Sequence, residues 1–267
     1  MQTELNDSEI RAVVAQLFPE NKVDYFTKLG IEMKEALALH KEVGLWELKD
    51  GKLDKANITA HCLLTTARVG VFADVLQLSD GKYEAMKGSA SHDYFKMKEN
   101  EITAVKGKTW AAYEEASLES VQGMHKAGFN YRTIRFASAN GHGSLKSIEV
   151  LLNKPKLHYG DLECLIAHYV DDYTINDLPV SPVSDDWSVN DFDRRIQANK
   201  ANPKYKILDE EGRQHFNGES TFEAQERIGH LVENFLAERV SQALGRYIPP
   251  KRLPDCIEFL LQKAMEL

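Results

Sequence analysis

The spacing of the apolar residues is the feature that most constrains the fold of this chain. Through most of its length they recur three or four positions apart, as on one face of a helix. The clearest stripe consists of Ile58, Cys62, Val69, Phe72 and Leu76. Strand signals are poor, because Thr133–Phe136 is short and Ser188–Phe192 has no partner joined to it by a hairpin turn. The sequence therefore predicts an all-α fold.

Capping residues and apolar stripes together give the expected helices. The central one begins near Asp54 or Asn57, and the helix that begins at Trp110 is closed by Gly128. Ser144 and Asp161 are candidate N-caps of two later helices. The remaining helices are expected in these regions: about 10–17, about 31–39, Glu84–Lys98, Phe222–Leu244 and Pro254–Leu267.

The length of 267 residues, with 43% hydrophobic residues, suits one large domain covering 1–267. Within it we expect a metal-binding core at about 31–175 and C-terminal helices at about 221–267. The stretch between them, about 176–220, is polar and contains Pro179, Pro182 and Pro203. It is expected to form an excursion that could cover a site, with a soft boundary near Ser181.

Acidic residues outnumber basic ones, 41 against 33, which gives a formal charge of −8. Proteins that bind polyanions in general are usually basic, so generic nucleic-acid or membrane-surface binding is not expected. A small phosphorylated substrate held by a local metal ion is compatible with this charge. The number of subunits is left open, and a homo-oligomer is one of the alternatives.

The cysteines indicate a reducing compartment. They are Cys62, Cys164 and Cys256, an odd number at wide spacing that favours neither a disulfide framework nor a zinc knuckle. The first residues lack the basic and apolar regions of a signal peptide, and no run of about 18 apolar residues is present. We therefore expect a cytoplasmic protein with no membrane partner.

Histidines and aspartates form the pattern that points to chemistry. His92 and Asp93 are adjacent, His61 precedes them by 31 residues, and His168 is followed by Asp171 and Asp172. Imidazole with carboxylate suits Mn, Fe, Zn, Co or Ni, with Mg as a further candidate. Neighbouring residues lie about 100° apart on a helix, so His92 and Asp93 can serve one ion only where the helix ends or is distorted.

This order of residues, with Lys96 three positions after Asp93, resembles the signature of the HD-domain superfamily of metal-dependent phosphohydrolases. The resemblance covers about 61–173. It implies an HD-domain-like helical bundle in which one ion is bound by His61, His92, Asp93 and a distant aspartate.

The last aspartate stays open between two neighbours. The resemblance slightly favours Asp171, because members often place a small or apolar residue before this ligand, as Val170 does here. Helical phase instead favours Asp172, which lies beside Leu165 when the helix is counted in steps of 100°.

A second ion is also implied by the resemblance. The segments GHGSLKSIEVLL and LECLIAHYVDDY are similar to those that supply two more histidines in two-metal members. His142 and His168, 26 residues apart, would bind this ion with Asp93 as a bridge. The expected cofactor is thus one or two divalent ions.

The expected function is metal-dependent hydrolysis of a phosphate ester or anhydride, with a nucleotide-type substrate and a metal-activated water as nucleophile. Asp93 and Lys96 are the candidate catalytic residues, and Lys96 and Arg195 are the candidates for binding phosphate. Glu99 is a candidate proton donor to the leaving group. A di-iron oxygenase of HD type and a non-catalytic module that senses a nucleotide are the alternatives.

Five histidines fit no part of this pattern and are expected to be ordinary surface residues, except that one, His158, could line the mouth of the site. They are His40, His125, His158, His215 and His230.

Overall fold

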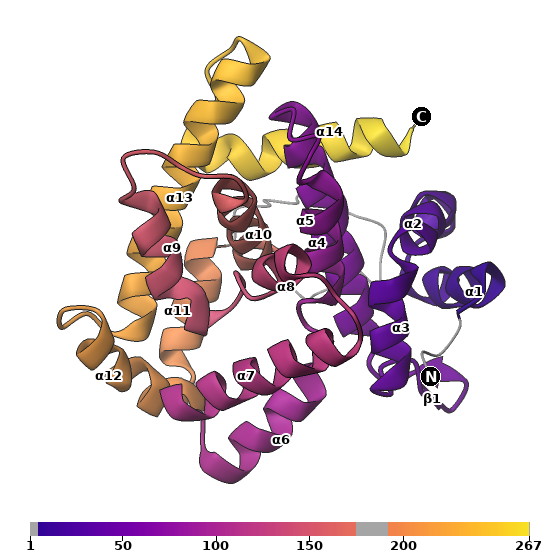
Figure 1. The fold of residues 1–267 in the computed structure, drawn as a ribbon, viewed down its shortest axis with the longest axis horizontal. Coiled ribbons are helices and arrows are strands. Elements are labelled where there is room, and N and C mark those ends of the chain that lie inside the picture. Colours follow the sequence, from indigo (N-terminus) through magenta and orange to yellow (C-terminus); the bar gives the residue numbers. More distant parts are fainter. Residues whose placement is uncertain (1–4, 175–191, 267) are drawn as a thin grey trace.

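The computed structural model describes residues 5–174 and 192–266, and over these residues the chain is helical almost throughout (Figure 1), which confirms the all-α prediction. The elements of the first half are α1 (Asp7–Leu17), α2 (Glu20–Glu32), α3 (Lys34–Glu42), β1 (Leu48–Lys49), β2 (Lys52–Leu53), α4 (Ala56–Val75), α5 (Lys82–Ser91), α6 (Lys96–Lys106) and α7 (Trp110–Lys126). Those of the second half are α8 (Tyr131–Ala137), η1 (His142–Ser144), α9 (Leu145–Leu152), α10 (Asp161–Tyr173), α11 (Phe192–Ala201), η2 (Pro203–Tyr205), α12 (Lys206–His215), α13 (Thr221–Leu244), η3 (Pro250–Arg252) and α14 (Leu253–Met265).

Helix α4 is the centre of the core. It packs against α5, α10 and α14, and its residues Leu63 and Phe72 are fully buried. Among the described helices it is the one long and apolar enough to cross a membrane, over Asn57–Val75, but 83% of that window is buried. A core helix of a soluble protein has this character, because apolar residues surround it on all sides.

The helix expected over Glu84–Lys98 is two helices. Helix α5 ends at Ser91, a turn contains His92 and Asp93, and α6 begins at Lys96. The Ser91 hydroxyl donates to the carbonyl oxygens of Lys87 and Gly88, at 2.9 and 3.2 Å, and so satisfies carbonyl groups at the end of α5. The His-Asp pair thus lies at a helix end, which is the condition for both side chains to face one site.

Two short segments bear on the weak strand signals. Thr133–Phe136, which was too short to predict a strand, lies in α8, where the Asn130 side chain caps the helix by accepting from the Thr133 backbone N–H. The hairpin of β1 and β2 was not predicted, although Asp50 and Gly51, both at positive φ, form its turn.

The expected start of α9 is confirmed, and those of α4 and α10 need correction. Lys55, and neither Asp54 nor Asn57, is the N-cap of α4. Ser144 does stand at the N-cap of α9, but its hydroxyl makes no capping bond. Asp161 is the first residue of α10 and Gly160, at φ 81°, is its N-cap.

The described part of the excursion, 192–220, is largely helical rather than irregular, since it forms α11, η2 and α12. Helix α11 packs on α13, where Phe192 lies so close to Gly229 that a Cβ on this glycine would be 2.2 Å from its ring. Helix α12 contacts α7, so the excursion returns to the helices around the site (Figure 1). Pro179, Ser181, Pro182 and most of the candidate strand Ser188–Phe192 lie outside the described residues.

Candidate metal centre

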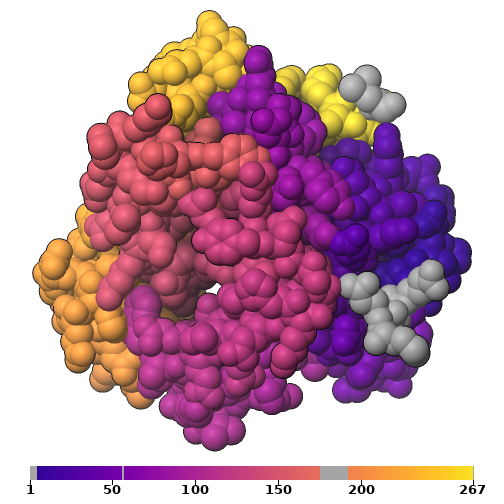
Figure 2. Space-filling model, in the orientation of Figure 1, coloured from indigo at the N-terminus to yellow at the C-terminus, as the bar shows by residue number. Residues whose placement is uncertain are grey.

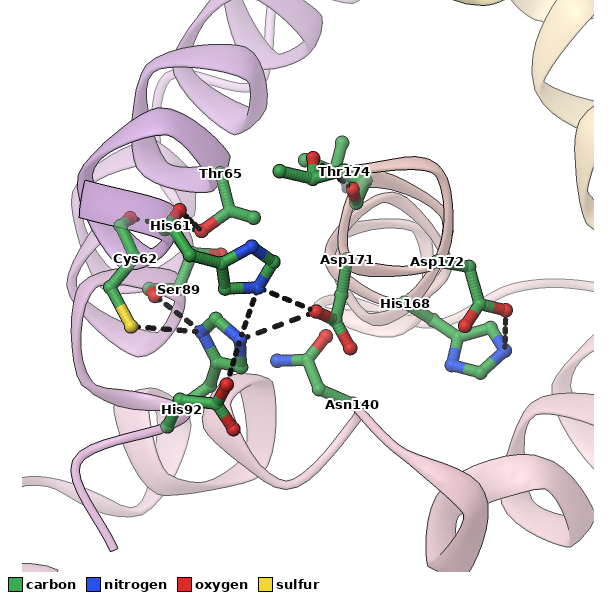
Figure 3. Close-up of polar contacts among 12 residues, drawn as sticks. His61, Cys62, Thr65, Ser89, His92, Asn140, His168, Asp171, Asp172 and Thr174 are labelled. Atoms are coloured by element: carbon green, nitrogen blue, oxygen red, sulfur yellow. Dashed lines mark hydrogen bonds and ion pairs between the residues drawn. The ribbon is translucent and has the colours of Figure 1, made fainter. Parts of the chain in front are cut away.

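Three buried side chains from distant parts of the chain meet at one point (Figure 3). His61 comes from α4, His92 from the turn after α5, and Asp171 from the last turn of α10. The Nε2 atoms of His61 and His92 are 3.2 Å apart, and Asp171 Oδ1 lies 3.0 and 3.3 Å from them. Atoms of these kinds at these distances could hold a metal ion.

The proton positions explain why a cation fits here. His92 Nδ1 lies 2.7 Å from the Ser89 carbonyl oxygen, which can only accept, so Nδ1 carries the hydrogen and Nε2 presents a lone pair. That lone pair faces His61 Nε2 and the Asp171 carboxylate. Three electron-rich atoms this close repel one another unless a proton or a metal ion lies between them. The donor set therefore fits a divalent transition-metal ion.

The local charges point the same way. Burial alone would lower the pKa of His92, but its neighbours Cys62, Asp93 and Asp171 outweigh burial and raise it well above its usual range. Burial alone would raise the pKa of Asp171, but His92 and His61 hold it well below its usual range. The centre thus favours an ionised carboxylate and additional positive charge.

Asp93 lies beside this group and not within it. Its Oδ2 is 3.9 Å from His92 Nε2, and its Oδ1 is 3.8 Å from the Lys96 ammonium. The Lys96 ammonium also pairs with Glu99 Oε1 at 2.9 Å. Lys96 is therefore held at the edge of the centre, with about a third of its side chain exposed. Asp93 is therefore a neighbour of the group formed by His61, His92 and Asp171, and not one of its members.

Asp172 points to the other side of α10 (Figure 3). Its Oδ2 lies 3.4 Å from His168 Nε2, and its Oδ1 accepts from the Gln225 amide at 2.9 Å. His168 Nδ1 lies 3.0 Å from the Ala139 carbonyl oxygen, so it carries the hydrogen. Of the two aspartates that the sequence left open, Asp171 is the one that faces His61 and His92.

The residues expected to bind a second ion do not meet. His142 packs edge-on against the rings of Tyr113, Tyr205 and Phe222, with centroids 5.4–6.4 Å away. Within 5–174 and 192–266, His142, His168 and Asp93 are not among the groups whose ligand atoms lie within 4.8 Å of one another. A different exposed group, Asp193, Glu226 and His230, does meet that distance. The second site implied by the resemblance therefore gains no support from this geometry.

Arg195, a candidate for binding phosphate, reaches from α11 to the end of α10. Its Nη1 donates to the backbone carbonyl oxygens of Asp171 and Asp172, at 2.8 and 2.9 Å. These are carbonyl groups at the end of α10, where a positive charge is favourable to the helix dipole. Arg195 thus positions the helix end that presents Asp171, and it also lines the adjoining pocket.

The centre opens into a pocket of about 690 Å³. Figure 2 shows a hollow on this face, between the surface of α6 and α7 and the surfaces of α9 and α12. The lining includes the sequence candidates His61, His92, Asp93, Lys96, Glu99, His142, Asp171, Asp172 and Arg195. It also includes residues that the sequence analysis missed, namely Lys108, Tyr113, Asn140, Lys204, Tyr205 and Gln225. Lys204 and Tyr205 are adjacent in the sequence, and this pairing of a cation with an aromatic ring could have indicated a binding surface.

Two of the remaining histidines differ from expectation. His40 is fully buried, with Nδ1 3.0 Å from the Thr59 hydroxyl, so the prediction of a surface residue was wrong. Burial, with a smaller effect of His92, lowers the pKa of His40 to about 4. His158 lines a separate surface pocket beside Gly160 and Leu162 and not the mouth of the candidate site.

Comparison of this chain with protein families, with curated proteins and with solved structures finds no match in any of the three. The fold and the geometry of the site are therefore the observations on which a function can be argued.

Proposed function

We propose that this protein is a metal-dependent phosphohydrolase that cleaves a phosphate ester or anhydride in a small, nucleotide-type substrate, in the cytoplasm. The observation that carries the proposal is the buried group of His61, His92 and Asp171 at one end of a pocket lined by lysine and arginine side chains. A metal centre beside positive side chains suits a phosphoryl group, whose oxygens carry the negative charge.

His61, His92 and Asp171 would bind the ion, and Asp93 is placed to join them. When bound, a divalent ion supplies a water of lowered pKa and offsets negative charge on the phosphoryl oxygens. Manganese, iron, zinc, cobalt and nickel all suit two imidazoles with carboxylates, and magnesium is a weaker match because it prefers oxygen ligands. The proposal requires one ion and leaves a second open.

Lys96 is the residue proposed to act on the phosphoryl group. Its ammonium lies 3.8 Å from Asp93 and 2.9 Å from Glu99, so it is fixed in place before substrate binds. A phosphoryl oxygen at the centre would compete with these carboxylates for the ammonium. Asp93 and Glu99 thus orient Lys96. We therefore assign Glu99 to positioning Lys96, and not to donating a proton to the leaving group.

The proposal is tested by metal analysis of the purified protein, followed by a screen of phosphate esters and anhydrides with each candidate ion added. We expect phosphate release that depends on the ion and is lost in His92→Ala. Iron content with oxygen consumption and no phosphate release would instead favour an oxygenase. Tight nucleotide binding with neither activity would favour a sensing module, and both results would overturn the proposal.

A further inference from the structure

The pocket has a second end, remote from the metal centre along the chain and different in character. Lys108 precedes α7, Tyr113 lies in its second turn, and Lys204 and Tyr205 belong to η2. All four line the same pocket as His61 and Asp171. A volume of about 690 Å³ suits a molecule of nucleotide size, which is larger than one phosphoryl group needs.

Among the described residues, no carboxylate pairs with the two lysines at this end, or with Arg195 beside the backbone of Asp171. Within the described residues, Lys108, Lys204 and Arg195 have no carboxylate oxygen within 4.0 Å. Lysines elsewhere differ, since Lys96 pairs with Glu99 and Lys200 with Glu226. In a chain with a net charge of −8, three pocket cations that pair with no described carboxylate are positive charge that this part of the pocket can offer to an anion.

Tyrosine rings hold the two lysines at the pocket. The Lys108 ammonium is 3.1 Å from the Tyr113 hydroxyl and 4.9 Å from the centroid of the Tyr205 ring. The Lys204 ammonium lies 4.7 Å from the same centroid. Cation–π contacts restrain long side chains without removing their charge, so these ammonium groups remain available to an anion.

The charges converge on the space between the two ends. Burial, together with the positive charges of Arg195, Lys96 and Lys108, lowers the pKa of His142 to about 3. The cations of α6, of the segment before α7 and of α11 therefore all lie close enough to His142 to affect its titration. A ligand that extends from the carboxylate of Asp171 past His142 would therefore come close to the cations Arg195 and Lys108.

We infer that Lys108, Lys204 and Arg195 form an anion subsite for a second phosphoryl group of the substrate. The inference rests on the proposed function, because it assumes that the phosphoryl group to be cleaved lies at the His61 end. It names the substrate class as compounds with two or more linked phosphoryl groups, and it disfavours simple monophosphate esters. Among the described residues, the hydrogen bonds of Arg195 come from Nη1, which leaves Nε and Nη2 to face a ligand.

The test measures binding as well as turnover, with inorganic tripolyphosphate and orthophosphate as probes in calorimetric titrations. The double variant Lys108→Met and Lys204→Met removes both lysines of the subsite. The matched control is Lys106→Met with Lys206→Met, which makes the same change of charge two residues away on each segment, outside the pocket lining. We expect the first double variant to lose about tenfold in tripolyphosphate affinity, with orthophosphate affinity unchanged within about threefold. The control should retain both affinities.

Equal loss in the control, no loss in the pocket variant, or wild-type protein that binds both probes equally would overturn the subsite. Failure of the proposed function has a different signature. Tripolyphosphate binding that depends on Lys108 and Lys204, with no phosphate released from any compound, would retain the subsite and reject the hydrolase.

Discussion

Two buried polar groups on α4 differ in how completely the protein satisfies them. Arg68 donates from Nε and Nη2 to Glu258 Oε2, at 3.2 and 3.0 Å, and from Nη1 to the Thr174 hydroxyl at 2.8 Å. Two turns earlier, His61 Nε2, His92 Nε2 and Asp171 Oδ1 lie within 3.3 Å of one another. The first group matches donors with acceptors, whereas the second keeps its three ligand atoms together only with a proton or a metal ion between them.

This difference separates stability from function. A buried ion pair with its hydrogen bonds made joins α4 to α14 and needs nothing further. Burying two imidazoles and a carboxylate against one another costs free energy until a proton or a metal ion binds between them. Buried polar groups of this kind, without complete hydrogen bonding, are typical of functional sites. Variants of the Arg68 group should therefore lose stability, and variants of the His61 group should lose metal and activity.

The largest effect is expected from His92→Ala. Removing one of three converging ligands should release the metal and lower turnover by more than about ten-thousandfold, because the activated water is lost. Elemental analysis and phosphate-release assays measure the two effects. His125→Ala, at an exposed histidine, is the control and should retain both metal and activity. Equal metal content in the two variants would remove His92 from the ligand set.

Arg68→Met should produce the opposite pattern. It leaves Glu258 buried without its partner, which typically costs about 3–5 kcal/mol of unfolding free energy. Metal content per folded chain should stay at the wild-type value, since no ligand is changed. Urea denaturation measures the cost, and replacing Glu258 with Leu in the same chain should recover part of it. If folded Arg68→Met contained less metal than wild type, the Arg68 group would be shown to support the metal centre as well as the fold.

Lys96→Met should lower turnover by about a hundred- to a thousandfold, or about 2–4 kcal/mol in the transition state. Metal content and Tm should change little, because about a third of this side chain is exposed and it is not among the three converging ligands. Lys98→Met, at a neighbouring lysine paired with Glu101 on the surface, is the matched control. Wild-type turnover in Lys96→Met would show an ordinary surface lysine, and loss of metal would show that Lys96 supports the centre.

The sequence predicted the all-α fold well, because apolar spacing reports helices directly. It predicted the residues of the centre by their order along the chain but could not choose between Asp171 and Asp172. Helical phase assumes one buried face and one exposed face, and α10 has buried residues on every side.

Lys108 and Lys204 were missed because nothing local relates two segments about a hundred residues apart. His40 was misjudged because its burial depends on packing against Thr59 of another helix.

The smallest effect is expected from Asp172→Asn, although Asp172 is as deeply buried as its neighbour Asp171. His168 Nδ1 gives its hydrogen to the Ala139 carbonyl, so a neutral His168 presents the Nε2 lone pair to Asp172 Oδ2, 3.4 Å away. Burial raises the pKa of Asp172, which favours a carboxylic acid that donates to this lone pair. An asparagine amide can donate in the same place and still accept from Gln225, so the variant should keep its metal.

The sign of the pH dependence follows from the raised pKa. The folded state holds the Asp172 proton more tightly than the unfolded state, so wild-type protein loses this stabilisation as pH rises from the unfolded pKa through the folded one. Asparagine does not titrate, and the Tm of Asp172→Asn relative to wild type should therefore increase from acidic to neutral pH. At neutral pH we expect its unfolding free energy to lie within about 1 kcal/mol of wild type. A loss of about 3–5 kcal/mol at neutral pH would instead identify an ion pair with a protonated His168, and it would make the Asp172 side of α10 resemble Arg68 and Glu258.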